Sequence, residues 1–200
     1  MMTTSERLPM AIPADWVPGP KQGNWTYQHY AALNDGQRYE IVNGVLLMSP
    51  SPTDWHQRVA GRIFYYLVTY VDLPGHGHVY QAPLDVRLSS KDVFQPDVFV
   101  VLNAGLEKVT EKGVIGAPDL VVEVASPSTA AFDRLTKYDA YARAGVPEYW
   151  IVKTDTCTVE VLVLEAGIYH SLGVFRGQQI LPSQVVPGLP VHVEQFFPHT

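Results

Sequence analysis

The sequence predicts an α+β fold of mixed α/β character, built around a central mixed sheet flanked by helices. Strand-like and helix-like segments intermix along the chain without the strict β-α-β alternation of a doubly wound fold. The run 98–102, and the run 120–124 apart from one glutamate, are apolar at both alternating positions, which is typical of strands buried on both faces. With 200 residues, 46% of them hydrophobic, the chain can form one domain with a sizeable core.

The first 25 residues differ in composition from the rest of the chain. They carry several prolines and glycines, which disfavour helix and sheet alike. We therefore expect an irregular, proline-rich arm over residues 1–25 and a single domain over residues 26–200. Trp16 and Trp25 could anchor this arm on its own domain or on a second subunit.

The domain is expected to begin with a short helix and a hairpin. Thr26 can cap a helix over about residues 26–33. Residues 38–42 and 45–49 then flank Asn43-Gly44, a pair that tolerates the positive φ angles of a type I′ turn. The sequence therefore predicts an N-terminal β-hairpin.

A longer helix and a strand come next. Thr53 or Asp54 can cap a helix over about residues 55–71, which has an apolar stripe at helical spacing. Residues 79–88 alternate between apolar and polar side chains, which predicts one half-exposed strand.

After the two apolar runs, the pattern predicts one more helix and several strands. The helix is expected over about residues 129–144, before Gly145 and Pro147. The strands are expected at 149–152, 158–164 and 167–175, with a short strand or turn ending near residue 197.

Two carboxylates interrupt the apolar runs. Asp97 directly precedes the first run and Glu123 lies inside the second. A charge in a buried strand needs a compensating partner, and the glycine-containing connection 103–116 would let the two strands lie side by side. Mg²⁺ prefers oxygen ligands at about 2.1 Å. The two acids, with the backbone carbonyl of Val124, could therefore hold a metal ion.

A second acid, Asp119, competes with Asp97 for this role. Asp119 and Glu123 lie four residues apart on one expected strand, hence roughly 13 Å apart and too far to share one ion. We therefore interpret Asp119 as a residue that starts its strand.

Lys137 is the third candidate catalytic residue. In metal-assisted phosphodiester cleavage, a lysine near the ion can orient the attacking water or neutralise charge on the phosphate. The alternative is an ordinary ion pair with Asp133, four positions earlier on the expected helix.

These residues carry a resemblance to a known family. Pro96-Asp97, then Glu123 in an apolar strand, then a lysine, resembles the PD-(D/E)xK nuclease superfamily with its restriction-endonuclease-like fold. More narrowly, several strings resemble the Uma-type (Uma-two) endonuclease family over about residues 26–197. These strings are Tyr-Glu-Ile-Val-Asn-Gly at 39–44, Met-Ser-Pro-Ser-Pro at 48–52, Gln-Pro-Asp-Val at 95–98, Ala-Pro-Asp-Leu-Val-Val-Glu-Val at 117–124 and Tyr-Ala-Arg-Ala-Gly-Val-Pro-Glu-Tyr-Trp at 141–150.

The resemblance implies metal ligation at Asp97 and Glu123. It also implies that Lys137 is the catalytic lysine, moved onto the helix, because Ala125 stands where the superfamily usually has its lysine. A second departure is Lys153, where relatives tend to carry aspartate, and we assign it no role.

Two further residues match the family. Glu40 could be an additional metal ligand or could orient Lys137, although a glutamate on a half-exposed hairpin is often only solvated. His56 could hold a phosphate or a water, although a histidine in the first turn of a helix often bonds a nearby backbone group instead.

The charge balance and the cysteine content exclude some classes of protein and of metal site. With 14 basic and 20 acidic residues and a net charge of −6, the chain does not resemble a protein that coats nucleic acid, although a nuclease needs only a local basic rim. The single cysteine, Cys157, excludes an intrachain disulfide and a cysteine zinc site. No apolar stretch reaches the roughly 18 residues that span a bilayer, so we expect a cytoplasmic protein without a membrane segment.

The sequence thus predicts a Mg²⁺-dependent endonuclease, a hydrolase of phosphodiester bonds, with Mn²⁺ as a substitute ion and DNA as the expected substrate. A homodimer would suit the cutting of both strands of a duplex. The alternative is a catalytically inactive protein of the same fold that serves as an interaction or nucleic-acid-binding module. Its motivation is the acidic net charge and the alanine at position 125.

Overall fold

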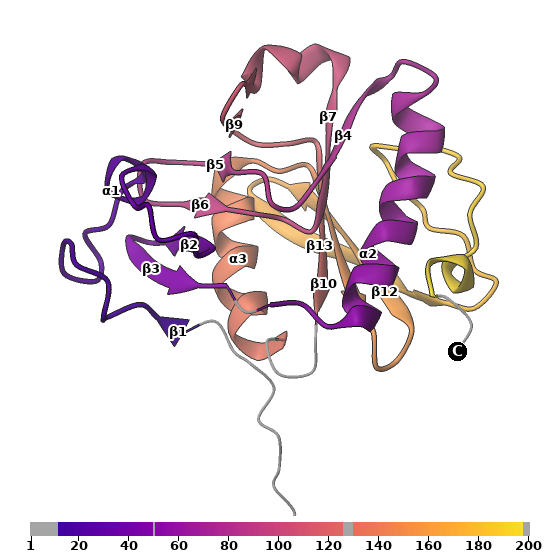
Figure 1. Cartoon of the computed structure of the whole chain (residues 1–200). Helices are drawn as coiled ribbons and strands as arrows, with labels where there is room; N and C mark the ends of the chain where they lie inside the picture. Colours follow the sequence, from indigo (N-terminus) through magenta and orange to yellow (C-terminus); the bar gives the residue numbers. More distant parts are fainter. Residues whose placement is uncertain (1–11, 50, 126–129, 198–200) are drawn as a thin grey trace, which may run out of the picture.

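The structure, a computed structural model, describes residues 12–49, 51–125 and 130–197 (Figure 1). Within these ranges the centre is a mixed sheet of six strands: β4 (Gly77–Gln81), β7 (Val98–Leu102), β10 (Leu120–Ala125), β11 (Glu148–Lys153), β12 (Thr158–Glu165) and β13 (Ile168–Arg176). Their spatial order is β13-β12-β11-β10-β7-β4. β10 and β11 run parallel, and the other neighbours run antiparallel. The predicted mixed α+β class is confirmed.

One face of the central sheet is covered by α2 (Asp54–Leu67). Thr53 caps this helix, because its hydroxyl accepts a hydrogen bond from the His56 amide at 3.2 Å. The helix ends at Leu67 rather than near the predicted residue 71 and continues as a π-helical turn, η1 (Val68–Asp72). Its buried side packs on apolar residues of the central sheet. This layer includes Val59, Ile63, Leu67, Val98, Val122 and Trp150.

The opposite face is covered by α3 (Ala130–Ala144) and a second sheet of short strands (Figure 1). Among the described residues these strands are β1 (Ile12–Pro13), β2 (Tyr39–Val42), β3 (Val45–Met48), β5 (Val86–Arg87), β6 (Val93–Phe94), β8 (Val109–Thr110) and β9 (Gly113–Ile115), in the order β1-β3-β2-β6-β5-β9-β8. Tyr141 of α3 packs with Phe99 of the central sheet and Phe94 of the second. The helix therefore joins the two sheets.

The predicted hairpin forms β2 and β3. Asn43 and Gly44 adopt φ angles of 50° and 75°, as a type I′ turn requires. A side chain at Gly44 would also meet the Gly23 carbonyl oxygen, 2.4 Å from an added Cβ. Both the positive φ angle of the turn and the close approach of the Gly23 carbonyl therefore favour glycine at position 44.

The described part of the proline-rich segment lies along this hairpin. β1 pairs antiparallel with β3, and the Trp25 amide donates to the Gly44 carbonyl at 2.9 Å. The Trp25 side chain is buried with Tyr39, whereas Trp16 is 56% exposed. Of the two tryptophans, Trp25 thus packs on its own chain.

One predicted strand is wrong. Residues 79–88 do not form a single strand, because β4 ends at Gln81 in the central sheet and β5 begins at Val86 in the second sheet. Pro83 lies between them and has no N–H group to donate to a sheet. The alternation of apolar and polar residues continues past Pro83, so the sequence pattern did not reveal the break between β4 and β5.

Short helical segments complete the fold. They are α1 (Tyr27–Ala31), which is shorter than the predicted 26–33, and two 3-10 helices, η2 (Asn103–Lys108) and η3 (Val193–Phe196). η3 takes the place where a short strand or turn was expected. In the part of the chain that the structure describes, every helix is too short or too polar to cross a bilayer.

Glu148 fastens the C-terminal segment to the central sheet. Its side chain is fully buried at the start of β11. One carboxylate oxygen accepts a hydrogen bond from Trp150 Nε1 at 2.6 Å, and the other accepts the amides of Gln184 and Val185 at 2.6 and 3.0 Å. This buried charge is thus stabilised by three N–H donors.

Candidate active site

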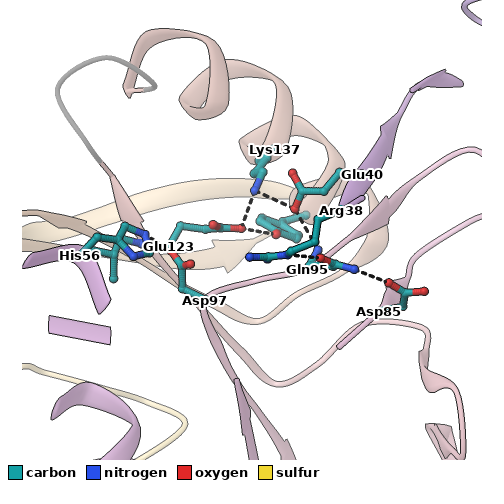
Figure 2. Close-up of polar contacts among 10 residues, drawn as sticks. Arg38, Glu40, His56, Asp85, Gln95, Asp97, Glu123 and Lys137 are labelled. Carbon is teal, nitrogen blue, oxygen red and sulfur yellow. Dashed lines mark hydrogen bonds and ion pairs between the residues drawn. The ribbon is translucent and has the colours of Figure 1, made fainter. Parts of the chain in front are cut away.

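The strand register brings the two acids together. β7 and β10 pair antiparallel with Val98 opposite Val122, so Asp97 and Glu123 occupy the next position of the pair. Asp97 Oδ2 accepts a hydrogen bond from the Val124 amide at 2.8 Å, which ties its carboxylate to β10. Figure 2 shows both carboxylates in one site.

Asp97 also contacts the first turn of α2. Its Oδ2 lies 3.1 Å from His56 Nε2, and the two side chains are 18% and 17% exposed. Burial lowers the pKa of His56, but the hydrogen bond and charge of Asp97, together with the charge of Glu123 and the Val124 backbone, raise it overall. The other ring nitrogen, Nδ1, is buried and has no hydrogen-bond partner among the residues that the structure describes. His56 thus contacts the Asp97 carboxylate and also the backbone of Val124.

Glu123 is held by two side chains of α3. Its Oε1 accepts hydrogen bonds from Lys137 Nζ at 3.1 Å and from the Tyr141 hydroxyl at 2.7 Å. Burial is the largest cause that raises the pKa of Glu123 to about 8, and the charge of Lys137 opposes it. The carboxylates of Asp97 and Glu40 raise this pKa further. The site therefore concentrates negative charge that a cation would relieve.

Lys137 lies between two carboxylates. Its Nζ is 3.1 Å from Glu123 Oε1 and 3.1 Å from Glu40 Oε1, and its side chain is 10% exposed. The same Glu40 oxygen accepts the Gln95 amide at 2.9 Å. Glu40 thus contacts Lys137 directly. The side chain of Asp133, the alternative partner of this lysine, lies outside the described residues.

The oxygen atoms that remain suit a hard cation. Asp97 Oδ1 and Glu123 Oε2 accept no hydrogen bond from the described residues, and Glu123 is 14% exposed. The described residues contain no cluster of three His, Cys, Asp or Glu side chains that could hold a metal. An ion here would complete its shell with a backbone carbonyl, such as that of Val124, and with water and substrate, as Mg²⁺ commonly does.

Other residues that the sequence singled out lie apart from this chemistry. Asp119 starts β10, and its Oδ2 accepts the Leu102 amide at 2.8 Å. Ala125 lies beside Lys153 in the parallel β10–β11 register. No described side chain bonds or pairs with Lys153, which continues to carry no assigned role.

Three residues of the site were not among the candidate site residues predicted from the sequence: Arg38, Gln95 and Tyr141, the last of which was expected to serve in packing. Tyr141 follows Lys137 by four positions, so the two share one face of α3. Arg38 precedes Glu40 by two positions and therefore lies on the same side of the hairpin strand. Helical and strand periodicity could have indicated both. Gln95 carries no such periodic signal.

Comparisons with known proteins bear on the fold and the family of this chain. A solved structure described as "a putative nuclease belonging to DUF820 from Anabaena variabilis ATCC 29413" has the same fold, with a TM-score of 0.72 and 17% identity over 86% of this chain and 97% of that chain. No curated protein matches the sequence. The family model Uma2, "Putative restriction endonuclease", matches residues 26–194. Because this match spans most of the chain, the protein belongs to the Uma2 family.

Proposed function

We propose that this protein is a divalent-cation-dependent endonuclease that hydrolyses phosphodiester bonds in DNA, with Asp97, Glu123 and Lys137 as its catalytic residues. The observation that carries the proposal is the 3.1 Å contact between Lys137 Nζ and Glu123 Oε1, directly beside the paired acids. Membership of a nuclease family supports nucleic acid as the substrate. Oxygen-rich ligands favour Mg²⁺, with Mn²⁺ as a substitute.

Each residue has a defined part in this proposal. Asp97 and Glu123 would hold the cation, with the Val124 carbonyl as a further ligand. When bound, the cation supplies Lewis-acid stabilisation of the charge that builds on the phosphoryl oxygens. The Lys137 ammonium, fixed by two carboxylates, orients a water toward the phosphate or neutralises its charge. His56, in contact with Asp97, holds a phosphate oxygen or a water.

The position of Lys137 also bears on the inactive alternative. That alternative was motivated partly by Ala125, where the superfamily's usual lysine is missing. Lys137 brings an ammonium to Glu123 from α3, and so supplies the same chemical group from another element. The contact therefore supports an active enzyme over an interaction module.

The expected homodimer and cytoplasmic location remain part of the proposal. A two-fold dimer would present two sites to the two strands of a duplex. The free, exposed Cys157 fits a reducing compartment. Light scattering of the pure protein, alone and with a DNA duplex, tests the dimer: a mass of one chain in both conditions excludes it.

The proposed activity is tested with supercoiled plasmid, Mg²⁺ or Mn²⁺, and chelator controls. We expect nicking by the wild type that EDTA stops and excess Mg²⁺ restores, and none by Asp97→Ala or Glu123→Ala. Arg176→Gln, on the distant strand β13, serves as a control that should match the wild type. Equal nicking by all these variants would identify a contaminant and refute the proposal.

A further inference from the structure

Arg38 lies next to the acid pair without a carboxylate partner. It directly precedes β2, two residues before Glu40. Its Nε donates a hydrogen bond to Gln95 Oε1 at 3.1 Å. Among the side chains that the structure describes, no carboxylate is within ion-pair distance of this arginine, and its two terminal nitrogens donate to none. The charge of this half-buried arginine is therefore not neutralised by any carboxylate of the described side chains, and an anionic ligand could pair with it.

Gln95, which accepts the hydrogen bond from Arg38, is itself held by three further hydrogen bonds. Its Nε2 donates to Asp85 Oδ1 at 3.0 Å and to the Tyr30 hydroxyl at 3.3 Å. Its backbone amide donates to Glu40 Oε1 at 2.9 Å. Because both amide hydrogens are used, the side-chain oxygen must face Arg38.

The free side of the guanidinium faces the site. Figure 2 shows it extending from Gln95 toward the side where Asp97 and Glu123 lie. None of the ion pairs among the described residues joins Asp97 and Arg38, so the charge of this guanidinium is not neutralised by that carboxylate. Two terminal N–H groups of one guanidinium match two oxygens of a phosphate, which a lysine cannot do in the same way.

We propose that Arg38 binds the non-bridging oxygens of the substrate phosphodiester beside Asp97 and Glu123, and that Gln95 is its positioning residue. The inference deepens the proposed nuclease function and rests on it. In this scheme the two acids bind the cation and Arg38 binds the phosphate. Lys137 orients the attacking water or neutralises the charge that develops on the phosphate. Glu40 links the last two, because one of its oxygens accepts both Lys137 Nζ and the Gln95 amide.

The test measures DNA binding separately from cleavage. Affinity for a fluorescein-labelled duplex is measured by anisotropy over a range of NaCl concentrations, with Ca²⁺ in place of Mg²⁺. We expect Arg38→Gln to lose about tenfold or more in affinity, and the slope of log affinity against log salt to fall by about one. Arg38→Lys keeps the charge and should lose less affinity. Arg176→Gln should match the wild type in both quantities.

Gln95 is tested by a double-mutant cycle. If Gln95 acts only by positioning Arg38, the effects of the two substitutions on DNA affinity are not additive, whereas a general loss of structure would weaken binding in either background. Gln95→Leu should weaken DNA binding in the wild type and add no further loss in Arg38→Gln. Thermal unfolding of every variant checks that the fold persists. If Arg38→Gln does not fold, Arg38→Lys alone decides, and unchanged affinity and cleavage rate in that variant would overturn the inference.

The two proposals fail in different ways. If wild type cuts plasmid, Glu123→Ala does not, and Arg38→Gln binds and cuts within twofold of wild type, the Arg38 inference is wrong while the nuclease remains. If wild type neither binds nor cuts DNA, both are wrong.

Discussion

The Lys137 ammonium lies 3.1 Å from the Glu123 carboxylate, although the two residues are 14 positions apart and belong to different elements. Glu123 is fixed on β10, and Lys137 reaches it from α3 across the face of the central sheet. The same ammonium contacts Glu40 on the hairpin at 3.1 Å. One lysine therefore connects three elements at the point where the two paired acids meet.

Removing the hydroxyl of Tyr141 should weaken cation binding without disturbing the fold. This hydroxyl donates to Glu123 Oε1 at 2.7 Å and lowers the pKa of that carboxyl. A hydrogen bond to a charged group is worth about 1.5 kcal/mol or more, so Tyr141→Phe should raise the Mg²⁺ concentration for half-maximal nicking about tenfold. Tyr138→Phe is the control: Tyr138 lies on the same helix as Tyr141, and its hydroxyl donates to the Tyr169 carbonyl on β13 instead. An unchanged Mg²⁺ requirement in Tyr141→Phe would contradict this role.

Glu40→Gln should separate the two roles considered for Glu40. One oxygen of its carboxylate accepts hydrogen bonds from Lys137 and from the Gln95 amide. The amide variant keeps an acceptor oxygen but loses the charge that pairs with the ammonium, so it should hold the lysine less firmly. We expect a loss of cleavage rate of about tenfold or more with little change in Mn²⁺ affinity measured by calorimetry. A loss of Mn²⁺ binding in this variant would instead make Glu40 a metal ligand.

The raised pKa of Glu123 predicts how stability changes with pH in the absence of a metal. Burial raises this pKa from 4.5 to about 8, so the folded state favours the protonated carboxyl. This contribution is fully present below about pH 4.5 and is lost as the pH rises through about 8. In EDTA, Glu123→Gln should therefore gain melting temperature relative to wild type as the pH rises from 5 to 8, about the interval between these two pKa values. A constant difference would contradict the raised pKa.

Glu148→Gln should destabilise the fold. The amide would present an NH₂ group to at least one of the N–H donors that now bond the two carboxylate oxygens. An unsatisfied buried donor costs about 1–3 kcal/mol, so we expect a loss of about 3 kcal/mol in the free energy of unfolding, measured in urea. Glu165→Gln, on the exposed end of β12, is the matched control and should change little. Equal stability of the two variants would show that these hydrogen bonds contribute nothing net.

The parts of the site that follow local patterns could be predicted from the sequence. Asp97 and Glu123 converge because two apolar strands joined by a glycine-containing connection pair side by side. The hairpin followed from Asn43-Gly44, whose backbone preference is local. Lys137 was identified through a family resemblance, since its contact with Glu123 depends on how α3 packs on the sheet.

The rest depends on tertiary contacts that no local pattern encodes. Arg38 and Gln95 are 57 positions apart, and Gln95 gains its orientation from Asp85 and Tyr30 on other segments. The strand expected over 79–88 failed because its alternating pattern continued across Pro83, where the chain passes from one sheet to the other. Periodicity indicates which side of a segment is apolar, but not in which sheet it lies.

The most direct test is the rate of plasmid nicking by wild type and Lys137→Ala, purified side by side and assayed with and without Mg²⁺. Lys112→Ala, an exposed lysine, is the control for charge loss. We expect Mg²⁺-dependent nicking by wild type and Lys112→Ala, and a loss of about a hundredfold or more in Lys137→Ala. Nicking that is equal in wild type and Lys137→Ala, while all three proteins remain folded, would contradict the assignment of Lys137 as the catalytic lysine.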